Sequence, residues 1–195
     1  MQVASAYRAL GGSDFCGDQV GHWTRGALAT LCVVDGLGHG PAAEHAAKVI
    51  LSFVGQNLDR SLQALFAGAD EAARETRGAA MGLALVNLRE MSLTHAGVGN
   101  TRAQLLRQTG RGLSALSSSN GIVGAGYKKL SPETVSFAPG DLLLLYTDGF
   151  PARVDAARFF WSRRAPEEVA REFLQESALG TDDAAVLVAR MESYE

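Results

Sequence analysis

The sequence has few cysteines and little excess charge of either sign. Its 195 residues include two cysteines, Cys16 and Cys32, and carry a formal net charge of -3. Two cysteines cannot build the disulfide framework of a small secreted domain, so we expect two reduced thiols, with Cys32 buried in an apolar run. Because no basic excess is present, nucleic acid is an unexpected partner.

Long hydrophobic runs are also missing. No apolar stretch approaches the ~20 residues that cross a bilayer, and the N-terminal residues MQVASAYRAL lack the basic and apolar segments of a signal peptide. We therefore expect a cytoplasmic protein without a membrane segment. The length and the 47% hydrophobic content predict that residues 1–195 form a single domain, and we expect a monomer.

Three apolar runs lack the polar alternation of a strand with one solvated face. They span residues 27–34, 142–146 and 184–189. Such runs are typical of strands that are buried on both faces. Four further strand-like runs between residues 81 and 116, separated by short breaks, predict an antiparallel meander, whereas residues 11–26 show little periodicity.

Three segments show helical signals. Apolar residues recur at helical spacing after Pro41, Ser61 is placed to cap a second helix that stops near Gly78, and a third helix opens near Pro166. Residues 117–129 are predicted to be a long mobile loop. Antiparallel strands with both faces buried require sheet on sheet inside and helices outside. The fold class predicted is therefore α+β, a four-layer αββα sandwich of two antiparallel sheets flanked by helices.

Aspartates fall at the ends of the predicted strands: Asp18 follows a glycine, Asp35 and Asp148 each end an apolar strand, and Asp182 and Asp183 precede another. A single aspartate beside a turn glycine is routine. If the strand ends converge, however, mutual repulsion at ~4 Å costs on the order of several kcal/mol, so either the pKa values rise or cations neutralise the cluster. A set of ligands made only of oxygen suits Mg²⁺ or Mn²⁺.

A pair of such ions suggests a reaction. Two ions about 3.5 to 4 Å apart can share a bridging water, lower its pKa and hold the attacking and leaving oxygens of a displacement at phosphorus. Gly36 and Gly149, which follow two of the aspartates, would let the main chain approach an ion. For each position taken alone, a simple turn remains an alternative.

Five motifs, in order along nearly the whole chain, carry a family resemblance. The chain resembles the metal-dependent protein phosphatases (the PPM, or protein phosphatase 2C-like, family) in their bacterial, SpoIIE-type branch. The resemblance implies a serine/threonine phosphatase with the αββα fold and two manganese or magnesium ions between the sheets. The motifs are Gly17-Asp18, Val33-Val34-Asp35-Gly36-Leu37-Gly38-His39-Gly40, Ala96-Gly97-Val98-Gly99-Asn100, Tyr146-Thr147-Asp148-Gly149 and Asp182-Asp183-Ala184-Ala185-Val186.

The resemblance also implies roles for individual residues. Asp35 corresponds to the ligand that bridges the two ions, and Gly36 to a ligand through its main-chain carbonyl. Asp148 and Asp182 correspond to ligands of one ion, and Asp18 to a ligand or a water-orienting acid. Asp18 and Asp35 are thus the expected catalytic pair.

Other positions are less determined. Asp183 is the alternative to Asp182, and Gly17 stands where eukaryotic relatives have an acid. No arginine can be placed with the substrate phosphate, for which Arg8 and Arg25 are candidates. His39 could donate a proton to a leaving alkoxide or pack within its loop, and we favour packing.

The short length and the DGLGHG motif most resemble the feedback phosphatases of the stressosome. This resemblance implies phosphorylated STAS-domain scaffold proteins as partners. The alternatives are a phosphatase of an anti-anti-sigma factor and a catalytically silent fold used as a binding module. The presence of every expected acid favours catalysis. A dinucleotide fingerprint is excluded by Pro41, and a P-loop by the residues that follow Gly126.

Overall fold

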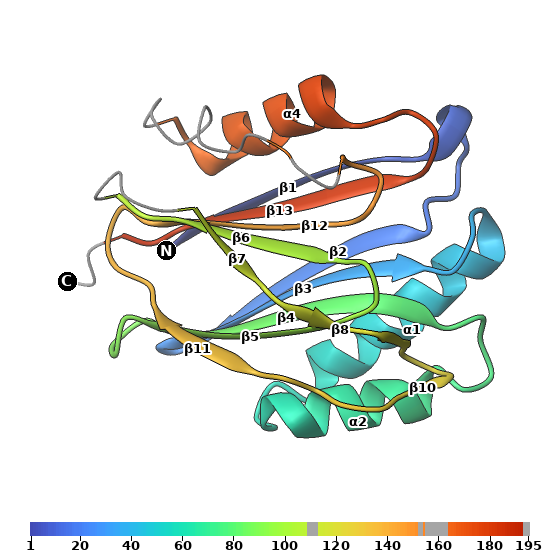
Figure 1. The fold of residues 1–195 in the computed structure, drawn as a ribbon, viewed down its shortest axis with the longest axis horizontal. Coiled ribbons are helices and arrows are strands. Elements are labelled where there is room, and N and C mark those ends of the chain that lie inside the picture. The colour runs from blue at the N-terminus through green and yellow to red at the C-terminus, as the bar shows by residue number, and fades with distance from the viewer. Residues whose placement is uncertain (109–112, 152–153, 155–163, 193–195) are drawn as a thin grey trace.

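Two antiparallel sheets form the centre of the protein (Figure 1). The computed structural model describes residues 1–108, 113–151, 154 and 164–192. The first sheet has the strand order β1 (Gln2–Arg8), β13 (Ala184–Arg190), β12 (Leu142–Tyr146), β6 (Arg102–Leu106) and β7 (Leu113–Leu116). The second has the order β11 (Glu133–Ser136), β5 (Ser92–Val98), β4 (Ala79–Asn87), β3 (Leu28–Gly36) and β2 (Asp18–Arg25).

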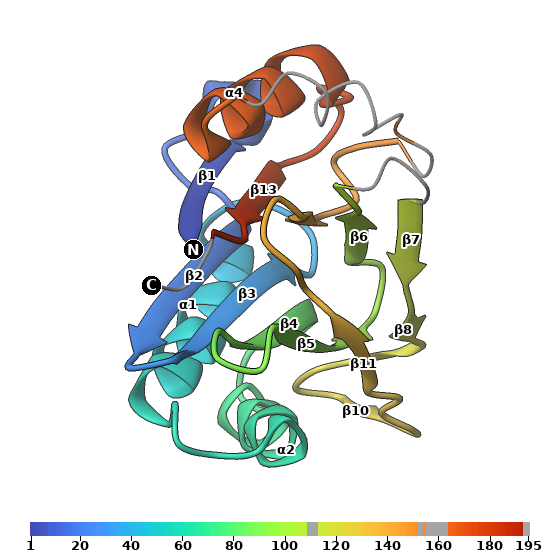
Figure 2. The ribbon, with the colours of Figure 1, turned by 90° about the vertical axis from the view of Figure 1, so that its left-hand side faces the viewer.

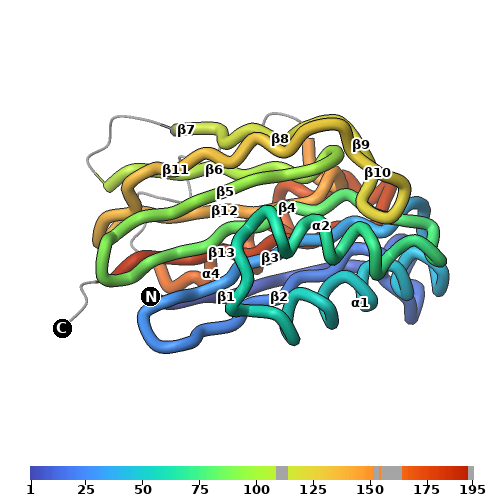
Figure 3. Tube along the Cα trace, turned by 90° about the horizontal axis from the view of Figure 1, so that it is seen from below, coloured from blue at the N-terminus to red at the C-terminus, as the bar shows by residue number. Residues whose placement is uncertain are grey.

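Helices cover the outer face of each sheet. α4 (Pro166–Ser177) lies on the first sheet, while α1 (Pro41–Gln56) and α2 (Leu62–Ala72) lie side by side against the second (Figures 1 and 3). Seen from the side, the order of layers is helix, sheet, sheet, helices (Figure 2). The predicted α+β fold, a four-layer αββα sandwich, is confirmed.

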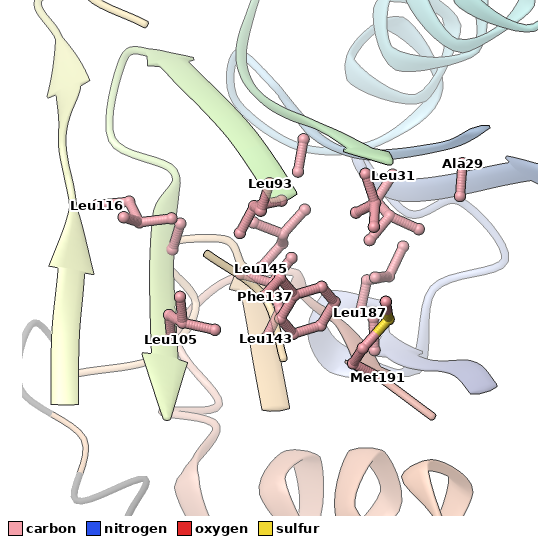
Figure 4. Packing of buried hydrophobic residues seen from close by; sticks show 14 of the residues in the cluster. Ala29, Leu31, Leu93, Leu105, Leu116, Phe137, Leu143, Leu145, Leu187 and Met191 are labelled. Atoms are coloured by element: carbon pink, nitrogen blue, oxygen red, sulfur yellow. The ribbon is translucent and has the colours of Figure 1, made fainter. Parts of the chain in front are cut away.

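Three apolar clusters explain why the central strands are apolar on both faces. In β3, Leu31 and Val33 belong to the core between the sheets, in which Figure 4 labels Leu31, whereas Cys32 and Val34 pack against α1 and α2. β12 and β13 divide their side chains in the same way between this core and the layer beneath α4. Because side chains alternate along a strand, a strand between two buried layers has no polar positions.

Local sequence signals set the helix ends. Pro41 occupies the first turn of α1, and the Ser61 hydroxyl accepts a hydrogen bond of 3.3 Å from the Ala64 amide at the start of α2. The predicted stop of this helix at Gly78 is wrong, because α2 ends at Ala72 and a turn follows. Both cysteines are free, as expected, and Cys32 is buried as predicted; Cys16, for which no burial was predicted, is buried as well.

The segment 11–26, in which no periodicity was expected, contains the edge strand β2. The predicted meander between residues 81 and 116 is also wrong. β4 and β5 pair in the second sheet, while the next hairpin, β6 and β7, belongs to the first. The change of sheet occurs at Gly99-Asn100, where the chain crosses the sandwich.

The predicted mobile loop 117–129 is held by hydrogen bonds. It contains β8 (Ser118–Ser119), which pairs with β5, and the small hairpin of β9 (Gly121–Ile122) and β10 (Gly126–Tyr127). The Asp70 carboxylate accepts from the Gly124 and Gly126 amides at 2.8 and 3.2 Å. Within the described ranges, no helix is long and apolar enough to cross a membrane.

Candidate metal centre

Asp18 and Asp35 face each other across two neighbouring strands. Asp18 begins β2, and the antiparallel register pairs it with Asp35 near the end of β3, at the right-hand end of the sandwich in Figure 1. The Gly36 amide donates to the Gly17 carbonyl at 3.1 Å, which fixes the two strand ends together. A β-carbon at Gly36 would collide with the main-chain carbonyl of Ala43, so only glycine lets α1 start this close to the strand.

The first sheet brings Asp148 to the same end. Asp148 lies just after β12, and Thr147 precedes it. Two hydrogen bonds join Thr147 to Ala185 of β13: the Thr147 amide donates to the Ala185 carbonyl at 3.1 Å, and the Thr147 hydroxyl accepts from the Ala185 amide at 3.0 Å. Thr147 also acts on Asp18 of the other sheet, since its side chain lowers the pKa of that carboxyl against the larger effect of burial. The Asn100 side-chain amide donates to Asp148 Oδ2 at 2.6 Å, which orients this carboxylate.

Asp182 and Asp183 have different roles although they are adjacent. Asp183 is buried, and its two oxygens accept from the Leu10 amide at 2.7 Å and the Gly17 amide at 2.6 Å, joining the sheets. Asp182 is exposed, and among the described residues it accepts only from the Asp183 amide, at 2.8 Å. The structure therefore leaves Asp182, rather than Asp183, free to bind a ligand. A β-carbon at Gly17 would lie 2.8 Å from that of Ala43, so this position has no room for an acid.

The shared burial of these carboxyls changes their titration. Burial, followed by the charge of Asp35, raises the pKa of Asp18 to about 9. Burial and the charges of Asp148 and Asp182 raise the pKa of Asp35 to about 7. The pKa of Asp182 is raised as well, because partial desolvation outweighs the hydrogen bond from the Asp183 amide. Each group thus resists ionising beside its neighbours, the result expected when carboxylates share one site.

A divalent cation fits this end of the sandwich. Asp18 Oδ2 is buried and has no hydrogen-bond partner, and no lysine or arginine in the described ranges forms an ion pair with any of the five aspartates. No three His, Cys, Asp or Glu side chains among the described residues are spaced to enclose one ion. Main-chain carbonyls and water would therefore have to complete the coordination, as hard cations commonly allow.

The other candidate site residues, one histidine and two arginines, lie partly at the carboxylate end of the sandwich and partly at the opposite end. His39 is exposed, so the packing role that we favoured for it is wrong. Arg25 pairs with Leu28 at the opposite end of β2 from Asp18 and is therefore excluded from the site. Arg8 pairs with Ala184 and lies at the carboxylate end.

Sequence reasoning missed two residues that support the site. Asn100 was part of a recognised motif but had no role until the fold placed it beside Asp148. Thr147 is fully buried, its hydroxyl accepts from the Ala185 amide, and its side chain lowers the pKa of Asp18 in the other sheet. A polar residue directly before a strand-end aspartate was the one available signal for Thr147.

Comparison with known proteins agrees with this geometry. The sequence profile of the stage II sporulation protein E (SpoIIE) family matches residues 17–192. The chain belongs to this SpoIIE-type branch of the PPM protein phosphatases. A curated relative is the phosphoserine phosphatase RsbX of Bacillus subtilis (strain 168), 25% identical over 138 residues, which are 71% of this chain and 69% of RsbX.

Solved structures share the fold of this SpoIIE-type chain. One, described as "The bacterial stressosome: a modular system that has been adapted to control secondary messenger signaling", is 31% identical with a TM-score of 0.91, over 97% of this chain and 98% of that one. RsbX in complex with magnesium is 19% identical with a TM-score of 0.87, over 97% and 94% of the two chains. The phosphatase domain of SpoIIE from Bacillus subtilis is 21% identical with a TM-score of 0.81, over 97% of this chain and 62% of that one.

Proposed function

We propose that this chain acts as a single-domain, metal-dependent phosphatase that removes phosphate from serine or threonine residues of STAS-domain stressosome proteins. The observation that carries the proposal is the convergence of Asp18, Asp35 and Asp148 from both sheets, with one buried carboxylate oxygen left without a partner. Membership of a phosphatase family supports the reaction class. The cytoplasm and a monomeric state are parts of the same proposal.

The residues that would hold Mn²⁺ or Mg²⁺ are those that the fold leaves available. Asp35, which interacts with both Asp18 and Asp148, would be the ligand shared by the ions, and the Gly36 carbonyl and the exposed Asp182 would be further ligands. When bound, two such ions lower the pKa of a water and neutralise charge on the phosphoryl oxygens.

The chain itself contributes orientation and proton control. The short bond from Asn100 holds the Asp148 carboxylate in one direction, and Asp183 fixes the start of β2 against the first sheet. Burial and Asp35 oppose the ionisation of Asp18 in the metal-free chain. A bound cation would favour the ionised form, and Asp18 could then orient the attacking water or accept its proton.

Two relatives support the substrate class. RsbX is named a phosphoserine phosphatase, and the 31% identical structure is described as part of work on the bacterial stressosome. Both fit a substrate that is a phosphorylated residue on a large assembly. We infer that the substrate residue enters from the end at which Asp182 is exposed.

The test compares two phosphoproteins under single-turnover conditions. The chain with Mn²⁺ is mixed with a phosphorylated STAS-domain scaffold protein and, separately, with a phosphorylated anti-anti-sigma protein, and phosphate release is measured. We expect faster release from the scaffold, and no release in excess chelator or with Asp35→Asn. A preference for the anti-anti-sigma protein would reassign the substrate. Equal release in chelator would exclude the mechanism, and no release from any phosphoprotein would leave a binding module.

A further inference from the structure

Arg77 lies in the turn between α2 and β4, directly beside the loop that follows Asp35. The Leu37 amide donates to the Gly78 carbonyl at 3.0 Å, which joins this turn to the loop. The turn is itself rigid, because the Thr76 hydroxyl donates to the Ala73 carbonyl at 2.6 Å and accepts from the Gly78 amide at 3.0 Å. The main chain of Arg77 is therefore fixed relative to the carboxylate cluster.

The Arg77 guanidinium rests over Gly38. A β-carbon built at Gly38, whose φ is +81°, would lie 2.9 Å from Arg77 Nη1. Glycine at this position allows the left-handed backbone and leaves the space that the guanidinium occupies. Gly38 is three residues beyond Asp35, so the cation lies at the rim of the site and not at a distant surface.

The charge of Arg77 has no partner in the part of the chain that the structure describes. The side chain is exposed, and no carboxylate among the described residues pairs with it, although five aspartates cluster at this end of the sandwich. Arg74, three residues earlier in the same segment, pairs with Glu71 at 2.9 Å. The guanidinium lies over the loop that follows Asp35 and is exposed, so its donors are available to a ligand that reaches this loop.

We propose that Arg77 binds the phosphate group of the substrate at the rim of the carboxylate site. The inference rests on the proposed phosphatase function and identifies the group that recognises the phosphoester. A guanidinium donates two parallel hydrogen bonds to a phosphate dianion, which no other side chain matches. Such a cation also offsets the repulsion between the dianion and the surrounding aspartates. It takes the place for which Arg8 and Arg25 were considered from sequence.

The experiment measures phosphate recognition in two independent ways. Steady-state hydrolysis of p-nitrophenyl phosphate and of a phosphoserine peptide gives kcat and KM with Mn²⁺, and calorimetry gives the Kd of inorganic phosphate for the Mg²⁺-loaded chain. The variants are Arg77→Ala, Arg77→Lys, Arg8→Ala and Arg74→Ala, the last being the matched control. Metal binding to each variant is titrated separately, so that a loss of metal is recognised.

With Arg77→Ala we expect KM and the phosphate Kd to rise about tenfold, as for the loss of hydrogen bonds to a charged group. Metal affinity should be unchanged, Arg77→Lys should recover part of the loss, and Arg74→Ala should stay within about twofold of the wild type. Unchanged KM and Kd in Arg77→Ala, or a larger loss in Arg8→Ala, overturns the inference while leaving phosphatase activity intact. Phosphate binding that depends on Arg77 without any turnover retains the inference and rejects the proposed function. A chain that neither binds nor hydrolyses phosphate rejects both.

Discussion

Asp18 and Asp141 are equally buried, each 3% exposed, but lie at opposite ends of the sandwich. Asp141 accepts from the Gln108 amide at 2.9 Å and the Ala138 amide at 3.0 Å, and pairs with Arg107 at 3.1 Å. Asp18 has one oxygen without a partner and stands among other carboxylates. Burial of an acid therefore does not distinguish a structural from a functional site; the partners of its oxygens do.

The largest expected contrast comes from removing a charge at the carboxylate end. Asp35→Asn should lower kcat/KM by more than about 10²-fold, because Asp35 is the proposed shared ligand of the ions and its loss would weaken metal binding. The same change should raise the unfolding temperature in chelator, since it relieves repulsion from Asp18 and Asp148. Activity assays and thermal unfolding check the two parts. Lower activity together with lower stability in chelator would contradict the account.

The carboxylate end should also make the stability of the chain depend on pH. The pKa values of Asp18 and Asp35 are raised in the folded chain to about 9 and about 7, so folding favours their protonated forms. These two groups therefore stabilise the metal-free chain most at low pH. Their contribution to the free energy of unfolding is lost as the pH rises through the two raised pKa values. Between pH 7 and 9 we expect a loss of about 2 kcal/mol in the free energy of unfolding.

Denaturant unfolding in chelator at pH 7, 8 and 9 measures this slope. This pH interval excludes the titration of His95. Burial lowers the pKa of His95 to about 4, so His95 changes the pH dependence of stability only at acidic pH. Asp18→Asn should flatten the dependence, and saturating Mn²⁺ should remove it. A stability that is constant or increasing over the interval would show that the carboxyls do not oppose one another.

At the other end, removing the charge should destabilise the fold. Asp141→Asn should reduce the free energy of unfolding by about 2 kcal/mol, because Arg107 and two main-chain amides lose a shared acceptor. We expect kcat/KM per folded molecule to stay within about twofold of the wild type. Urea unfolding with activity measured on the same samples tests this. Loss of activity without loss of stability would place Asp141 in the site.

The smallest effect is expected at the support of Asp148. Asn100→Ala should weaken metal binding and activity about tenfold, because the carboxylate loses the donor that orients it. Isothermal titration with Mn²⁺ gives the affinity directly. Asn87→Ala is a suitable control, since Asn87 bonds only to the amides of its own turn. Equal affinities in the two variants would show that Asp148 needs no such support.

The central strands were predictable because their continuous apolar runs have a single cause, burial on both faces. β3, β12 and β13 lie between two buried layers, so every position is apolar and the sequence alone shows it. β2 was missed because it is an edge strand with Gly21 at its centre, over which Trp23 packs. The prediction of a meander was wrong because no local sequence feature at Gly99-Asn100 indicates that the chain passes from one sheet to the other there.

The acids of the site were predictable, but their supports were not. Asp35 and Asp148 each end an apolar run, a position that sequence displays. The contact of Asn100 with Asp148 joins residues 48 positions apart, and Arg77 meets Gly38 only because β3 and β4 pair. Such contacts follow from the register of the sheets. The different roles of Asp182 and Asp183 could likewise be assigned only once the fold showed that the Leu10 and Gly17 amides donate to Asp183.

The most direct test is anomalous diffraction from crystals of the chain grown with Mn²⁺. The account predicts anomalous peaks within coordination distance of the Asp35 carboxylate, with Asp18, Asp148 or Asp182 completing the ligands, and no peak in crystals of Asp35→Asn. Manganese bound elsewhere, or Asp35 and Asp148 pointing away from each other with no ion near either, would contradict it.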